Sequence, residues 1–373
     1  MTPKENNNML EQGRITYKQL ILLIVISRII VTITYLPAMS EPPKNQDMWI
    51  SELLFFPLQF VLALPVYLLW KRFPDQTIIQ YSPIIAGKLG KIIGVLLLWY
   101  FLHFTTIGLA QFGLFLTTAV MPETPFLFFT ITLILVCAYA ILKGLEVISR
   151  LAEFFAPIIL IAITTIFFLL AKDMNLKTLT PVLEKGVLPV FQGSLIYGSR
   201  TIEVLGLAML LPYLNNPQKA KSVFIVSFAL ISLFFVLLTL PVLTVFGFEE
   251  ASSRTFPFYS VIRLVNVADF LERIESVHMA IWILGAFIKI SLTYYLAVLG
   301  LSQLLNLKDY KPLVLPTGTI IISLSLLVAP SLVELREFTS YKIFAPYSYF
   351  FILFIPFLLL LTAIIRKKGA KSK

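Results

Sequence analysis

Ten apolar stretches run through this chain, nearly all of them long enough to cross a bilayer, and some carry ionised side chains in mid-stretch. Arg28 lies in the first stretch, and Arg200 and Glu203 lie in the sixth. A charged group at the centre of a bilayer costs about 2.5–3.5 kcal/mol. Such groups persist where they face a water-filled cavity, a partner charge or a ligand. The pattern therefore predicts an all-α integral membrane protein with a polar interior.

The composition supports this class, because a chain that is 58% hydrophobic has too few polar residues to cover a soluble globule. A spanning helix needs about 20 mainly apolar residues. We expect a cytoplasmic tail at residues 1–16, one membrane domain at residues 17–365 and a basic cytoplasmic tail at residues 366–373. The expected spans are Tyr17–Ala38, Trp49–Trp70, Ile92–Val120, Phe126–Leu142, Phe154–Ala171, Gly193–Pro212, Ser222–Phe248, Val277–Leu305, Leu313–Val333 and Tyr347–Ile365.

The distribution of charge predicts the orientation. With a cytoplasmic N-terminus and ten spans, 18 of the 30 Lys and Arg residues fall on the inner side and 9 on the outer side, whereas the acids divide into 6 inside and 13 outside. Cytoplasmic loops carry the excess of Lys and Arg, so both termini are expected in the cytoplasm. The net charge of +10 is then a signal of membrane orientation, with lipid as a partner, and not of nucleic-acid binding.

The residues that usually carry catalysis or metal binding are scarce. The chain has one cysteine, Cys137, and two histidines, His103 and His278. A single cysteine excludes an internal disulfide and a cysteine metal site. We therefore expect no metal, no cofactor and no enzymatic activity.

The sixth span is the most polar of the ten, and three glycines surround its polar residues. Glycine weakens a helix, and polar side chains can satisfy the backbone groups that a break releases near the membrane midplane. Arg200 and Glu203 are three residues apart, hence on one helical face and spaced to pair. The alternative is an unbroken helix with a purely structural Arg–Glu pair. The candidate ligand-binding residues here are Tyr197, Gly198, Ser199, Arg200, Thr201 and Glu203.

Two further spans offer candidates. Ser27, Arg28 and Thr32 belong to a polar stripe of the first span, and Arg28 either clamps a ligand carboxylate or pairs with an acid such as Glu203. Lys289 lies about half-way along the eighth span. We expect it to face inward, where its tethered charge would replace a coupling cation; snorkelling to an interface is the alternative.

Two polar clusters flank the membrane domain as possible gates or subunit contacts. On the inner side, Glu146, Arg150 and Glu153 share one helical face. Their alternative role is an ion-paired helix entry. On the outer side, residues 256–277 predict a short amphipathic helix over the extracellular mouth, either a solvated face or a lid. The charged residues proposed there are Arg263, Glu272, Arg273 and Glu275.

Five segments carry a resemblance to a known family. KGLEVISRLAEFFAPI (143–158) resembles the junction of the fourth and fifth spans of the bacterial spore germination permeases, and TFPFYSVIRLVNVADFLERIES (255–276) is similar to a loop of that family. RFPDQTIIQYSPIIAGKLGKIIG (72–94), LTPVLEKGVLPVFQGS (179–194) and MLLPYLN (209–215) add to the likeness.

The resemblance implies the B subunit of a nutrient germinant receptor in the inner membrane of endospores. It implies companion A and C subunits, the latter a lipoprotein, and a likeness to the amino acid–polyamine–organocation transporters. Their LeuT-like fold has a 5+5 inverted repeat with helices 1 and 6 interrupted, which places the ligand site on Ser27–Thr34 and Tyr197–Glu203. The first span departs from that pattern, because SRIIVTIT (27–34) contains no glycine.

The function expected is that of a sensor that binds a small nutrient, an amino acid, at the midplane and triggers spore germination through its partners. Two alternatives stay open. One is a secondary amino acid transporter, and the other is a scaffold subunit that binds no nutrient.

Overall fold

The computed structural model describes residues 10–11, 13–34, 39, 41–264, 274–328 and 330–369. A helix occupies each of the ten expected spans. These helices are α1 (Tyr17–Thr34), α2 (Met48–Arg72), α4 (Lys88–Phe115), α5 (Phe126–Leu142), α6 (Leu145–Leu170), α7 (Val187–Ser199) with α8 (Glu203–Leu210), α9 (Ala220–Ser253), α11 (Ile274–Leu304), α12 (Val314–Val328), and α14 (Tyr341–Tyr349) with α15 (Ile355–Ile365).

Shorter elements connect these helices. They are α3 (Ile78–Ala86), α10 (Pro257–Ile262) and α13 (Leu332–Phe338), the π-helical turns η1 (Leu116–Val120) and η7 (Phe350–Phe354), and the 3₁₀ turns η2 (Ala171–Asp173), η3 (Leu176–Leu179), η4 (Leu211–Tyr213), η5 (Pro217–Lys219) and η6 (Lys311–Leu313). Within the described residues, seven helices are long and apolar enough to cross a membrane, and α7 with α8 forms an eighth, broken span. The protein is a multi-pass membrane protein.

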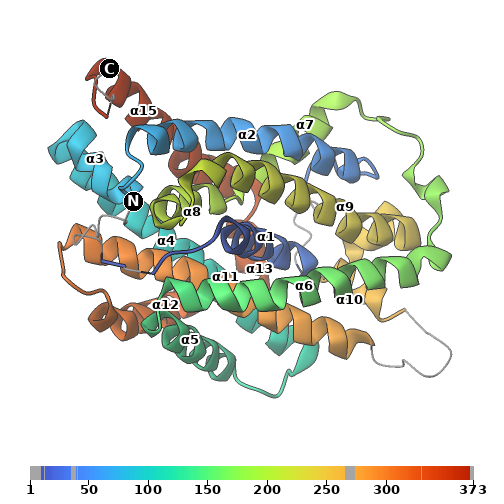
Figure 1. Cartoon of the computed structure of the whole chain (residues 1–373). Coiled ribbons are helices and arrows are strands. Elements are labelled where there is room, and N and C mark those ends of the chain that lie inside the picture. The colour runs from blue at the N-terminus through green and yellow to red at the C-terminus, as the bar shows by residue number, and fades with distance from the viewer. Residues whose placement is uncertain are drawn as a thin grey trace.

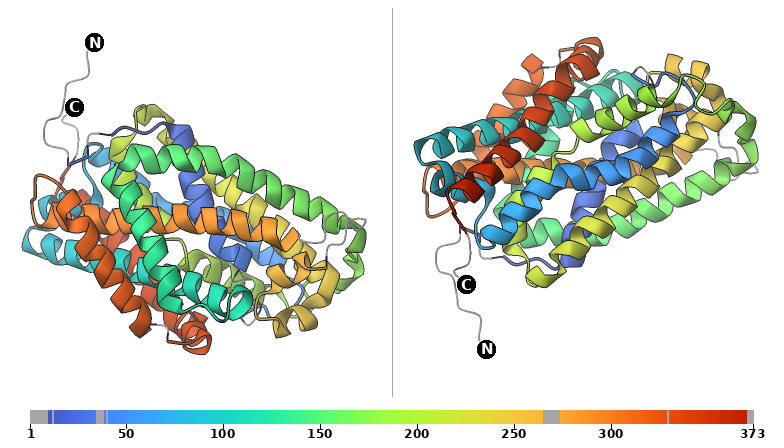
Figure 2. Two further views of the ribbon diagram at one scale, coloured as in Figure 1. Left: turned by 90° about the horizontal axis from the view of Figure 1, so that it is seen from below. Right: turned by 90° about the horizontal axis from the view of Figure 1, so that it is seen from above.

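Helix α1 lies at the centre of the bundle. Four consecutive residues, Leu23 to Ile26, are fully buried. Four consecutive positions cover every face of a helix, so neighbouring helices enclose α1 on all sides. These neighbours are α6, α9 and α11, which run past it in Figures 1 and 2, and α2 packs on the outside against α7 and α9. Polar groups of α1 therefore meet protein and not lipid.

The sixth span is interrupted, as its glycines and polar residues predict. Helices α7 and α8 are bent by 40° at residues 200–202. Hydroxyl groups satisfy part of the released backbone: Ser199 Oγ donates to the carbonyl of Ile196 (2.8 Å), and Thr201 Oγ1 donates to the carbonyl of Tyr197 (3.3 Å). The carbonyl of Ser199 accepts from the Ser348 hydroxyl of α14. These bonds make a break tolerable inside the membrane.

The first span differs from the expected pattern. Helix α1 is continuous from Tyr17 to Thr34, so no interruption falls within Ser27–Thr34. The absence of glycine from this stretch is the physical reason, because nothing in it favours leaving the helical conformation. Residues 35–38 and 40 lie outside the described part of the chain.

Both ends of the described chain lie at the same end of the bundle. Near the N-terminus, the Glu11 carboxylate accepts from the backbone N–H of Leu145 and from the hydroxyl of Tyr310, each at 3.1 Å. Near the C-terminus, the Arg366 guanidinium donates to the carbonyl of Ile85 in α3 (3.0 Å). The hydroxyl of Thr77, which caps α3, donates to the side chain of Gln303 near the end of α11 (2.7 Å) and so connects α3 to α11.

Candidate functional site

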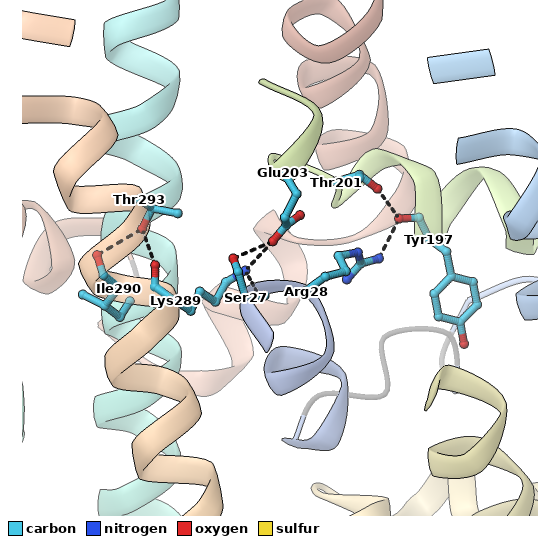
Figure 3. Close-up of polar contacts among 8 residues, drawn as sticks. All are labelled: Ser27, Arg28, Tyr197, Thr201, Glu203, Lys289, Ile290 and Thr293. Carbon is cyan, nitrogen blue, oxygen red and sulfur yellow. Dashed lines mark hydrogen bonds and ion pairs between the residues drawn. The ribbon is translucent and has the colours of Figure 1, made fainter. Parts of the chain in front are cut away.

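A buried network of charge joins α1, α8 and α11 (Figure 3). The Lys289 ammonium donates to the carbonyl of Ser27 at 2.8 Å and lies 3.4 Å from the Glu203 carboxylate. The Ser27 hydroxyl donates to the same Glu203 oxygen at 2.8 Å. Glu203 is the first residue of α8, where the positive end of the helix dipole favours a carboxylate. Lys289 therefore faces inward and does not reach a membrane interface.

Arg28 points from α1 toward the end of α7. Its guanidinium donates to the carbonyl of Tyr197 at 2.8 Å and lies over the ring of Phe235, 4.6 Å from the ring centre. No described acid lies within 4.0 Å of it, so the expected alternative of a pair with Glu203 is not formed. Arg28 thus binds the backbone of α7 through a charge-assisted bond.

Arg200 does not pair with Glu203. Its guanidinium donates to the carbonyl of Thr339, at the end of α13, at 2.7 Å. The expected pairing assumes a regular helix from Tyr197 to Glu203, whereas the break at residues 200–202 turns the two side chains to different neighbours. The prediction of an Arg200–Glu203 pair is wrong for this reason.

The other expected site residues occupy several positions. Ser199, Thr201 and Gly198 are buried at the break, where their contacts are to backbone or to neighbouring helices. Thr32 lies in α1, but its side chain is outside the described residues. The network of Figure 3 brings together Ser27, Arg28, Tyr197, Thr201, Glu203 and Lys289.

Glu52 is a buried acid that the sequence did not single out. It lies near the start of α2 and is fully buried, and its Oε1 accepts from the Tyr197 hydroxyl at 2.7 Å and from the Thr239 hydroxyl. The charge count places it among the 13 acids of the outer side. The signal that could have found it is its position inside the apolar run that starts at Trp49.

Two spaces among the described residues bear on ligand access. A space of about 20 Å³ lies beside Lys289, between α1, α4 and α11, and is bordered by Trp282. This volume holds about one water molecule. A larger space of about 600 Å³ is lined by apolar side chains of α4, α5, α6 and α11 and does not include the charged residues. A ligand larger than water therefore does not fit into this space beside Lys289 unless its lining residues move.

The flanking clusters are only partly assembled. Arg150 and Glu146 form an exposed ion pair at 2.6 Å, whereas Glu153 accepts from Gln19 of α1 at 2.8 Å. On the outer side, α10 is short and packs through buried Phe258 and Val261, and exposed Arg263 follows it. Glu275 lies in the first turn of α11. Glu272 and Arg273 lie outside the described residues.

Three solved proteins, among them a transporter and a symporter, share this architecture. The closed nucleobase-cation-symport-1 transporter Mhp1 with bromovinylhydantoin bound has a TM-score of 0.64 at 12% identity, covering 99% of this chain and 83% of that one. MhsT in complex with L-phenylalanine gives 0.62 at 13%, covering 97% and 100%. A Na⁺-coupled sialic acid symporter gives 0.69 at 10%, covering 98% and 93%. The protein therefore has the LeuT-like transporter fold.

The sequence comparisons place the chain more narrowly. Residues 14–333 match the family described as spore germination protein, and the chain belongs to that family. Spore germination protein KB of Bacillus subtilis (strain 168) is 28% identical over 371 residues, which are 98% of each chain. Spore germination protein YndE of the same organism is 26% identical over 303 residues, 79% of this chain and 82% of the relative. This confirms the resemblance carried by the five segments, and a permease family on a transporter fold is not a family of enzymes.

Proposed function

We propose that this chain is the B subunit of a nutrient germinant receptor, which binds a small nutrient, an amino acid, between α1 and the α7–α8 break. The observation that carries the proposal is the set of buried charges at that break, Arg28, Glu203 and Lys289, in a chain of the spore germination family. Buried charges inside a membrane mark ligand or ion sites. Mhp1 and MhsT, which share the fold, were solved with small ligands bound.

The proposed action is a shift between two conformations. A ligand favours a conformation only through its higher affinity for it. Because the described interior leaves about 20 Å³ beside Lys289, nutrient binding would open the contacts of Lys289 with Ser27 and Glu203. Lys289 holds the place that a free cation would otherwise take between α1 and α11. The outer segment with Arg263, Glu272, Arg273 and Glu275 and the inner residues Glu146, Arg150 and Glu153 would contact the companion A and C subunits or move with the gate.

The proposed location is the inner membrane of the spore, with both termini in the cytoplasm. The excess of Lys and Arg at the end of the bundle that holds both termini supports this orientation.

The test is the nutrient dose-response of germination in spores that carry Arg200→Lys or Thr201→Val, with subunit levels measured by immunoblot. We expect the half-maximal nutrient concentration or the nutrient preference to change at normal subunit levels. Thr106→Val is the matched control, because Thr106 is also a buried threonine whose hydroxyl donates to the carbonyl four residues earlier. Unchanged responses in both site variants would place the nutrient elsewhere.

A secondary transporter is the second candidate, and it is favoured by the fold shared with Mhp1, a nucleobase-cation-symport-1 family transporter, and with the Na⁺-coupled sialic acid symporter. Accumulation of labelled amino acid in vesicles that contain this chain alone would support transport. A scaffold subunit instead predicts that Thr201→Val lowers the amounts of the A, B and C subunits together and leaves the nutrient preference of the remaining receptor unchanged.

A further inference from the structure

Two buried groups of opposite charge type form no ion pair within the described part of the chain. Arg28 is 2% exposed and Glu52 is 0% exposed. Within the described residues, no acid lies within 4.0 Å of Arg28 and no cation within 4.0 Å of Glu52. The neighbouring Glu203 differs, because the Lys289 ammonium already lies 3.4 Å from it. A buried charge without a close partner is costly, so a ligand that carries charges of both signs would stabilise this arrangement.

Both charges bind Tyr197, at opposite ends of that residue. The Arg28 guanidinium donates to its backbone carbonyl, and its phenol donates to Glu52 Oε1. Figure 3 shows the Tyr197 ring extending away from Arg28, so its hydroxyl holds Glu52 at the far end of the ring. Tyr197 is therefore a rigid spacer between a buried cation on α1 and a buried anion on α2.

Each charged group also keeps one polar atom without a partner. These are Nε of Arg28 and Oε2 of Glu52. An unsatisfied buried donor or acceptor loses its hydration without a replacement. The two free atoms are of complementary kinds, a donor on the cation and an acceptor on the anion. A ligand with one carboxylate and one ammonium group would satisfy both.

Aromatic rings contact both the Arg28 guanidinium and the Tyr197 ring. Phe55 and Phe235 stack on each other with ring centres 5.9 Å apart, and both contact the Tyr197 ring, at 6.1 and 5.5 Å. Their faces already attract the Arg28 guanidinium, at 5.6 Å for Phe55 and 4.6 Å for Phe235. Aromatic faces beside a carboxylate also suit an ammonium group.

We propose that Arg28 and Glu52 form a dipolar subsite in which Arg28 binds the carboxylate of an α-amino acid and Glu52 binds its ammonium. Glu52 is then the residue that selects for a free amino group, whereas Glu203 already has the Lys289 ammonium 3.4 Å away before a ligand binds. This subsite rests on the proposed function, and it adds a residue of α2 to a site otherwise built from α1 and the α7–α8 break.

The first part of the test uses spores with the unaltered receptor. Germination is measured with the proteinogenic amino acids, glucose and inosine as probes. For each amino acid that acts, its N-acetyl derivative and its 2-hydroxy analogue are compared with it. We expect half-maximal concentrations about 10–100-fold higher for both analogues, because neither carries an ammonium group to pair with Glu52.

The second part uses Glu52→Gln. We expect the half-maximal concentration of the amino acid to rise about 10–100-fold, while that of the N-acetyl derivative stays within about twofold, so that the preference disappears. Thr239→Val is the matched control, because it removes a hydroxyl donor from Glu52 and keeps the charge. That variant is expected to retain the preference.

The other outcomes show whether the subsite or the proposed receptor function is wrong. If Glu52→Gln keeps the full preference for the free amino group at normal subunit levels, the subsite is wrong. Germination by glucose or inosine alone also overturns the subsite and leaves the nutrient receptor standing. If no probe acts while the A and C subunits are present, the proposed function itself fails. Should Glu52→Gln not accumulate, equal responses of the unaltered receptor to an amino acid and its N-acetyl derivative would overturn the subsite.

Discussion

At the scale of single residues, the structure pairs charges that are far apart in the sequence. Lys289 and Glu203 are separated by 86 residues and form an ion pair in which both side chains are at most 5% exposed. Removing one member of such a pair leaves an uncompensated charge, which costs about 3–5 kcal/mol, whereas replacing both with apolar groups is often neutral. The stability of the contact between α8 and α11 should therefore suffer when one partner is removed, and much less when both are replaced.

Glu203→Gln is expected to destabilise the protein by about 3–5 kcal/mol, because the Lys289 ammonium then has no counter-ion. The double change Glu203→Gln/Lys289→Met should restore most of this loss. The measurement is the thermal unfolding midpoint of the purified receptor in lipid nanodiscs, together with its amount in spores. Nutrient response is expected to be lost in both variants.

Glu146→Gln serves as the control for the same chemical change at the surface. Its partner Arg150 is on the same helix, and the two side chains are 45% and 68% exposed. Exposed pairs of this spacing contribute about 0.3–0.5 kcal/mol, so the unfolding midpoint should barely move. Equal losses in Glu203→Gln and Glu146→Gln would contradict a special role for the buried pair.

At the scale of elements, the break between α7 and α8 depends on how closely its neighbours approach. A Cβ on Gly198 would lie 2.4 Å from the Tyr349 hydroxyl and 3.2 Å from the side chains of Leu58 and Leu62. The Tyr349 hydroxyl is itself fixed by a 2.6 Å bond to the carbonyl of Leu195. Gly198 therefore lets α2 and α14 pack directly against the end of α7.

Gly198→Ala should lower stability by about 1–3 kcal/mol through overpacking at this contact. Gly206→Ala, in α8, should be neutral or stabilising, because its Cβ would meet Leu296 at an ordinary 3.5 Å and alanine favours a helix over glycine by about 0.5–1 kcal/mol. Unfolding midpoints of the two variants test the difference.

Addition of Tyr349→Phe to Gly198→Ala should recover part of the lost stability, because it removes the hydroxyl that the new Cβ would meet. Equal unfolding midpoints for Gly198→Ala and Gly206→Ala would refute this account of the break.

At the scale of the whole molecule, the orientation in the membrane is a prediction from the charge distribution and from the shared end of the two termini. The exposed residues Glu123 and Lys308 lie in the α4–α5 and α11–α12 connections and are predicted to lie on the outer and inner sides. Cys137 is buried and is the one cysteine of the sequence. A Cys137→Ala variant therefore contains no cysteine that a maleimide could label.

In that background, Glu123→Cys should react with a membrane-impermeant maleimide in intact cells. Lys308→Cys should react only after the membrane is permeabilised. The reverse pattern would invert the predicted orientation, and labelling of both from outside would contradict an odd number of spans between them.

The sequence alone determined the class of protein, the positions of the long apolar helices and the interrupted sixth span. Long apolar runs, the numbers of Lys and Arg residues in each loop and clustered glycines are features of the local sequence. They can be recognised without knowledge of tertiary contacts. It also marked Arg28, Glu203 and Lys289 as charges that must face inward, because lipid cannot solvate them.

Only the tertiary structure decided the partners. Glu203 binds Lys289 and not Arg200, because the break redirects a side chain whose neighbours come from α1 and α11. The burial of Glu52 was likewise decided by packing. The sequence around Glu52, near the start of an apolar run, would be the same whether its carboxylate met water or Tyr197. Only the approach of α7 and α9 to α2 distinguishes the two cases.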